Sequence, residues 1–180
     1  MDKQRVLAKR VAFCSVADIA SAAALLSIVF AASSVQAATC TATSGTGSWI
    51  VPATWTGCAG GVPGAADTAQ INAGSTVTVP TGATVTVAAI EFGATGFTYG
   101  LTVDGTLSVG NLAQRGGSVI SGLGAITVTG TYDWVGSGAL DGVLRPDGTA
   151  PPLILAPGSV WNLNATTLLL RRRAIVQQGS

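Results

Sequence analysis

The chain has 180 residues, no histidine, 9% charged residues and a formal net charge of +1. Without histidine, Ser-His-Asp and Cys-His catalytic arrangements are excluded. Lys and Arg are too few to form the basic stripe that phosphate backbones require, so we expect no nucleic-acid partner. Glu and Lys are scarce while Gly, Thr, Val and Ala are abundant, and this composition favours an all-β domain.

Residues 1–37 have the layout of a secretory signal peptide. Basic residues between Lys3 and Arg10 precede an apolar stretch over 21–32, and Val35-Gln36-Ala37 fits the small-residue rule for cleavage before Ala38. A retained membrane anchor is the alternative, because 11–32 nearly supply the roughly 20 apolar residues that a spanning helix needs. The sequence therefore predicts a secreted or cell-surface protein with no membrane span in its mature part. That part would contain no lysine and carry 5 − 6 = −1 charge.

Two cysteines remain after the predicted signal, Cys40 and Cys58. An even pair in an oxidising compartment predicts one disulfide, which should stabilise the fold by about 3 kcal/mol. A metal site is disfavoured, because the two thiols are not in a CxxC spacing and no histidine can complete a ligand set. We expect no metal and no cofactor.

From residue 75 onward, aliphatic residues alternate with Thr, Ser and Gly in short runs that end in glycine turns, which predicts short strands. Four similar runs place Val79, Val103, Val128 and Leu155 at separations of 24, 25 and 27 residues. Repeats of this length are typical of stacked units. We predict a right-handed parallel β-helix of about four rungs, with these four residues stacked. A sandwich or barrel would need more hairpin turns such as Asp104-Gly105.

The repeat divides the mature chain into three parts. Residues 38–74 do not fit it and predict an N-terminal cap that holds the disulfide. Within this cap, we expect Trp49 and Trp55 to form a plug over the core. The alternative is that the two tryptophans form a platform on which a sugar stacks. Residues 75–170 form the rungs. Residues 171–180 predict a polar tail whose arginine run is a solvated face. No aromatic cap follows, so we expect further rungs, self-association or a partner at this end.

Few residues are candidates for chemistry. Asp133 and Asp141 are the best carboxylate pair for cleaving a glycosidic bond, but Asp before Gly is also an ordinary turn residue. We expect no catalytic residues. Trp134, Asp133 and Trp161 are the candidates for ligand binding, and their presence on one open face would favour a carbohydrate. Calcium binding near Asp147 is disfavoured, because repeated Gly-Gly-x-Gly-x-Asp turns are absent.

The cap motif is similar to known openings of extracellular proteins. Trp49-x2-Pro-Ala-Thr-Trp55-x-Gly57, followed by 60–79, resembles the start of bacterial autotransporter-type β-solenoids and of the G8 domain. Runs such as Leu101-Thr-Val-Asp-Gly-Thr-Leu107 resemble filamentous-haemagglutinin repeats. The resemblance covers about 45–170. A complete autotransporter would also carry a C-terminal membrane barrel, so we do not expect this chain to be one.

The resemblance implies a non-enzymatic secreted or surface solenoid that acts in adhesion or as a structural scaffold. Its partner would be a glycan or protein on a host or neighbouring cell. Two alternatives stay open: a carbohydrate-binding or polysaccharide-cleaving β-helix module, and an incomplete fragment of a larger surface protein.

Overall fold

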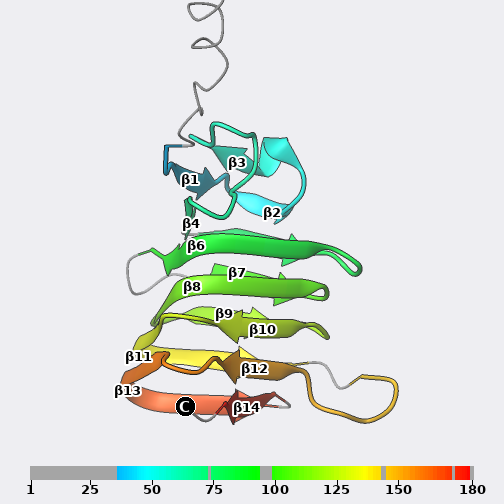
Figure 1. The fold of residues 1–180 in the computed structure, drawn as a ribbon, viewed down its shortest axis with the longest axis vertical. Helices are drawn as coiled ribbons and strands as arrows, with labels where there is room; N and C mark the ends of the chain where they lie inside the picture. Colours follow the sequence, from blue (N-terminus) through cyan, green and yellow to red (C-terminus); the bar gives the residue numbers. More distant parts are fainter. Residues whose placement is uncertain (1–35, 73, 94–98, 143–144, 172, 179–180) are drawn as a thin grey trace, which may run out of the picture. The chain divides into compact units, whose positions relative to one another are not determined.

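The computed structural model describes residues 36–72, 74–93, 99–142, 145–171 and 173–178. The predicted signal core lies outside this range. Parallel strands stack into coils, which confirms the predicted all-β solenoid (Figure 1). From β4 (Thr68–Ile71) to β13 (Val160–Arg171) the chain makes about four turns.

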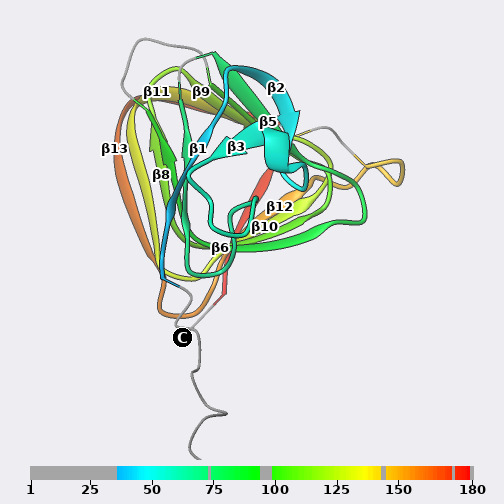
Figure 2. The same ribbon diagram turned by 90° about the horizontal axis from the view of Figure 1, so that it is seen from above.

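Each turn of the chain crosses three faces of the sheet, so the outline along the coil axis is triangular (Figure 2). Face A contains β2 (Gly45–Ser48), β5 (Ser75–Val79), β7 (Tyr99–Val103), β9 (Ser118–Ser121) and the second halves of β11 (Thr131–Asp141) and β13. Face B contains β1 (Thr39–Ala42), β4, the second halves of β6 (Thr84–Phe92) and β8 (Thr106–Arg115), and the first halves of β11 and β13.

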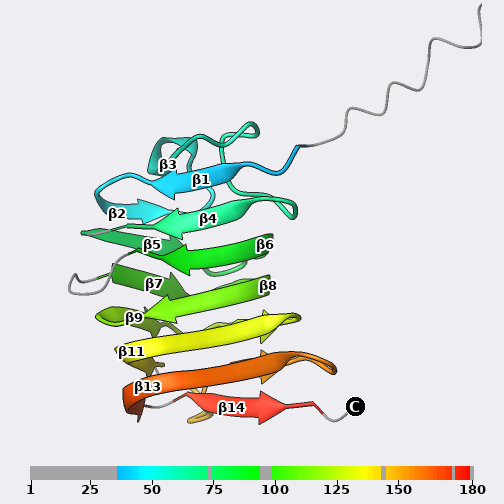
Figure 3. The same ribbon diagram turned by 90° about the vertical axis from the view of Figure 1, so that its left-hand side faces the viewer.

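Face C completes the coil and contains the first halves of β6 and β8, then β10 (Ala125–Val128), β12 (Pro152–Leu155) and β14 (Ala174–Gln177). The long strands β6 and β8 pass around the corner from face C to face B. Figure 3 shows face B, on which β4, β6, β8, β11 and β13 lie one below another. Chain order is therefore B, A, C, repeated down the solenoid.

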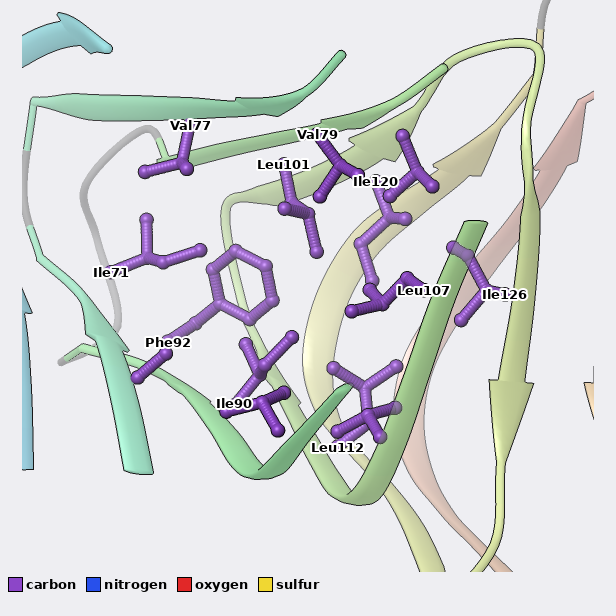
Figure 4. Close-up of a cluster of buried hydrophobic side chains, with 14 of the residues drawn as sticks. Ile71, Val77, Val79, Ile90, Phe92, Leu101, Leu107, Leu112, Ile120 and Ile126 are labelled. Atoms are coloured by element: carbon purple, nitrogen blue, oxygen red, sulfur yellow. The ribbon is translucent and has the colours of Figure 1, made fainter. Parts of the chain in front are cut away.

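The core runs along the axis, between the three faces. Side chains alternate inward and outward along each strand, as in the burial pattern BiBiB of β5 and β7. Like residues stack from coil to coil: Leu107 is in register with Ile126, and Ile126 with Leu153. Figure 4 shows such side chains from all three faces meeting in the interior. Burying each large aliphatic side chain contributes about 2 kcal/mol.

The predicted stack of four residues is half right. Val79 is in register with Val103 on face A, and Val128 with Leu155 on face C, as expected. Val103 and Val128, however, lie on different faces, and the residue above Val128 is Val109. The reason is that each coil contains the same alternating pattern on three faces, so similar runs need not belong to one face.

The solenoid also begins earlier than predicted. Within the expected cap, β1 already pairs in parallel with β4, and β2 with β5. The β2 sequence Gly-Thr-Gly-Ser hides this, because it has no apolar alternation. Gly47 is small for a reason: a Cβ there would lie 2.5 Å from the Thr54 side chain. Residues 49–67 form the true cap, with the 3-10 helix η2 (Pro52–Thr54) and β3 (Trp55–Thr56), which pairs antiparallel with β1.

The predicted polar tail over 171–180 is in part a further strand. Residues 174–177 form β14, which pairs with β12 on face C. Arg173, predicted to be solvated, is only 6% exposed. Its guanidinium donates to the backbone carbonyls of Asp141 at 3.0 Å, Gly124 at 3.2 Å, Gly122 at 3.3 Å and Pro152 at 3.4 Å. The five N–H donors of arginine can satisfy several buried carbonyls at once, which explains the burial.

Candidate functional site

The three predicted ligand-binding residues do not lie on one open face. Trp134 is fully buried, on the inward side of face B. Asp133, next to it in the strand, is half-buried and alternates to the outward side. Trp161 is half-buried one coil further on, where its ring stacks on Tyr132 at a centroid distance of 6.1 Å and an interplanar angle of 12°. The faces of the Trp134 indole are therefore not available to a sugar.

Tyr132 and Trp134 belong to the core instead. The Tyr132 hydroxyl donates to Gln114 Oε1 at 2.6 Å, and Gln114 Nε2 donates to the carbonyl of Ala139 at 3.0 Å. Both Tyr132 and Gln114 are fully buried. Burial raises the pKa of Tyr132 well above its ordinary value, and the nearby Arg173 guanidinium offsets a smaller part of this rise. Tyr132 and Gln114 therefore satisfy each other's hydrogen-bonding groups inside an apolar interior.

The two tryptophans of the cap pack against each other at the N-terminal end of the core. Trp49 is 1% and Trp55 5% exposed, and their rings meet edge to face at 4.9 Å. Trp55 Nε1 donates to the carbonyl of Trp49 at 3.0 Å, and Trp49 Nε1 to that of Pro63 at 3.4 Å. These positions are those of a plug rather than of an exposed platform. The predicted disulfide between Cys40 and Cys58 is present and ties β1 to the segment after β3.

The carboxylates considered for hydrolysis are distributed over the molecule. Asp133 lies on face B, in register with Ala113 and Asn162, whereas Asp141 ends the part of β11 that lies on face A. The part of the chain that the structure describes holds no group of three or more His, Cys, Asp or Glu residues that could bind a metal. It likewise contains no helix that could span a membrane.

A polar groove of about 290 Å³ follows the corner where the chain turns from face A to face C. We call it the A/C groove. Glycine, threonine and two charged side chains from four successive turns line it: Gly82, Ala83, Thr84, Asp104, Gly105, Thr106, Leu123, Gly124, Ala125 and Arg145. The residues that form it are about 20 positions apart in sequence, and for that reason no local motif predicts the groove.

Glycines allow the turns that line the groove to stack closely. A Cβ on Gly124 would collide with the carbonyl oxygen of Gly105, and a Cβ on Gly105 would collide with that of Ala83. The corner turns therefore pack backbone on backbone. Gly82 has φ of +80°, a left-handed conformation that glycine adopts without strain. The sequence signal is the glycine in each of these turns.

Two opposite charges are fixed at the A/C groove. Asp104 Oδ1 accepts a hydrogen bond from the backbone N–H of Leu123 at 3.1 Å, and Arg145 Nε donates to the carbonyl of the same residue at 3.2 Å. With the hydroxyls of Thr84 and Thr106, the groove offers both donors and acceptors. Such a surface suits a polar, hydroxyl-rich ligand.

The outward side of face C carries a ladder of hydroxyl groups beside this groove. Thr86 is in register with Ser108, and Ser108 with Thr127, while Thr84 is in register with Thr106. Neighbouring strands are about 4.8 Å apart, so the hydroxyls form a regular array. Comparison with protein families, with curated proteins and with solved structures finds no match to this chain.

Proposed function

We propose that this chain is an exported, non-enzymatic solenoid that acts by surface contact, as an adhesin or a structural scaffold. One observation carries the proposal: the interior is filled by apolar side chains, while face C and the A/C groove present an ordered array of hydroxyl groups. The disulfide supports export, because such bonds persist in oxidising compartments. Asp133 and Asp141, on different faces, do not offer the paired carboxylates of a hydrolase.

The partner that this surface favours is a glycan on a neighbouring cell or matrix. Sugar hydroxyls both donate and accept hydrogen bonds, and the A/C groove supplies Asp104, Arg145 and threonine hydroxyls for them. Carbohydrate binding as the sole role is the second candidate function, and the groove is the observation that favours it. The two differ in what is bound: cells in the first case, isolated oligosaccharides in the second.

Binding of the exported protein to washed bacterial cells and to immobilised oligosaccharides tests the proposal. The triple variant Thr86→Ala/Ser108→Ala/Thr127→Ala removes three hydroxyls in register on face C. The matched control Thr78→Ala/Thr102→Ala/Ser121→Ala removes three on face A, also in register. We expect the face C variant to lose at least about tenfold in affinity, which is about 1.4 kcal/mol, and the control to bind normally. Equal binding by both variants would contradict a role for face C.

A further inference from the structure

Asp67 lies at the entry to β4 and is held in place from several sides. The side chain is only 7% exposed. Its Oδ2 accepts from the backbone N–H of Gly64 at 2.8 Å, and its Oδ1 accepts from the backbone N–H of Ala38, also at 2.8 Å. The Asp67 carbonyl in turn accepts from Ala88 at 3.1 Å. The two carboxylate oxygens therefore accept from two different nitrogens, Oδ2 from Gly64 within the cap and Oδ1 from Ala38 before β1.

In the part of the chain that the structure describes, no positive side chain pairs with this carboxylate. The five positive side chains that follow residue 37 are all arginines at position 115 or later, and no lysine follows Lys9. Among the described residues, Asp67 forms no ion pair with any of these arginines, and its hydrogen bonds come from neutral amides. Burying a carboxylate is costly unless a positive charge compensates it. Among the described residues, the almost buried Asp67 carboxyl group at the N-terminal end of the solenoid therefore has no counterion.

Cleavage of the predicted signal would supply that counterion at the required atom. Hydrolysis of the Ala37–Ala38 bond adds water across it: the carbonyl carbon of Ala37 gains oxygen and becomes a carboxylate, and the nitrogen of Ala38 becomes an ammonium group. This nitrogen is the atom that lies 2.8 Å from Asp67 Oδ1. Resting on the proposed export, we infer that Asp67 is the binding site for the free Ala38 ammonium, which a signal peptidase creates and which then locks β1 to the cap.

Only cleavage before Ala38 places the new ammonium group beside Asp67. The carbonyl of Ala38 accepts from the N–H of Thr68 at 2.8 Å, and Thr39 is in register with Thr68. Ala38 is therefore fixed whether or not residues precede it. Cleavage one residue earlier or later would move the ammonium by about 3.5 Å along the chain, out of reach of Oδ1. The bond to the carboxylate is already charge-assisted by its acceptor, and an ammonium donor adds the attraction between opposite charges at an almost buried position, so the cleaved form gains stability.

The absence of lysine makes a selective test possible. The full chain is expressed in an exporting bacterium, and the mass of the purified product identifies its first residue. The product then has one primary amine, that of Ala38. It is treated in denaturant with acetic acid N-hydroxysuccinimide ester, then with hydroxylamine, and is refolded. This procedure acetylates Ala38 alone. Acetylation keeps the N–H donor and removes only the charge. A sample treated without the ester is the control.

We expect a product that begins at Ala38, and acetylation should lower its unfolding midpoint by about 3 °C. In Asp67→Asn, which keeps an acceptor oxygen but no charge, acetylation should have less than a third of this effect. No change on acetylating the wild-type product would overturn the inference, whether or not Asp67→Asn folds. So would an exported product that begins at another residue. A chain that stays in the cytoplasm with residues 1–37 attached would instead contradict the proposed export.

Discussion

At the scale of single residues, the later coils depend on two polar side chains buried in the apolar core. Gln114 connects Tyr132 on the next coil to the carbonyl of Ala139. Arg173 satisfies carbonyls at the corner between faces A and C, on coils above its own. Burial lowers the pKa of Arg173 to about 10, so it remains charged at neutral pH. Gln114 and Arg173 each donate hydrogen bonds to backbone carbonyls that would otherwise be left unpaired.

Tyr132→Phe should destabilise the protein by about 1–3 kcal/mol, because Gln114 Oε1 loses its donor inside the core. The loss should depend on pH. The pKa of Tyr132 is raised above 10.0 in the folded protein, whereas the unfolded chain ionises near that value. The stability that the hydroxyl contributes is thus complete below pH 10 and falls above it.

Denaturant unfolding of both proteins at pH 8, 10 and 11 measures this effect. The difference between wild type and Tyr132→Phe should shrink by about 1 kcal/mol from pH 10 to pH 11. A difference that is the same at pH 8 and pH 11 would mean that Tyr132 is not buried as the structure places it.

Arg173→Met should destabilise the protein by about 2 kcal/mol or more, because the carbonyls of Gly122 and Gly124 lose a charged donor. Arg115→Met is the matched control, since Arg115 is half-buried and lies on face B. There we expect a change within about 0.5 kcal/mol. Chemical denaturation measures both. Equal effects of the two substitutions would argue against the buried position of Arg173.

At the scale of elements, the cap is held by the antiparallel pair of β1 and β3 and by the disulfide beside it. Cys40 and Cys58 are separated by 18 residues. Replacing both with serine should lower the free energy of unfolding by about 3 kcal/mol, because the unfolded cap is no longer constrained. Treating the wild type with dithiothreitol should reproduce this loss, and the reductant should not affect the double variant. Unchanged stability on reduction would show that the bond does not constrain the cap.

Some elements were predictable from the sequence and others were not. Alternation and glycine turns predicted the strands from 75 onward, and the two cysteines that follow the predicted signal peptide predicted the disulfide. β2 was hidden, because Gly45 and Gly47 replace the apolar residues of a normal strand. β14 was hidden behind three arginines, since a polar run gives no sign that one guanidinium is buried. In both cases tertiary contacts, not local pattern, decide the structure.

The candidate site was less predictable than the strands. An open face shared by Trp134 and Asp133 would have favoured a carbohydrate ligand, but adjacent residues of a strand point to opposite sides of the sheet, so only one of them can face outward. The A/C groove combines Asp104, Arg145 and glycines from several turns, and their contact depends on the coil register. Asp104 was interpreted as a turn residue. The hydrogen bond that it accepts from the Leu123 N–H agrees with this interpretation. A turn residue alone, however, gives no sign of a groove.

At the scale of the whole molecule, a three-sided cross-section gives the chain a closed apolar interior and three polar outer faces. Its last coil is more open than the rest. Leu163 is in register with the buried Trp134, yet it is 47% exposed. The proposed contact surface depends on the register that places the hydroxyl ladder of face C on the outside.

Cysteine cross-linking tests that register most directly. In the structure Thr86 lies beside Ser108 on adjacent strands of face C, whereas Thr102 and Thr127 lie on faces A and C. Neighbouring strands are close enough for a disulfide, whose Cα atoms are usually about 5.5–6 Å apart. Under mild oxidation, Thr86→Cys/Ser108→Cys should form an intramolecular disulfide, detected by mass spectrometry, and Thr102→Cys/Thr127→Cys should not. Cross-linking of the second pair but not the first would contradict the three-sided solenoid and the surface built on it.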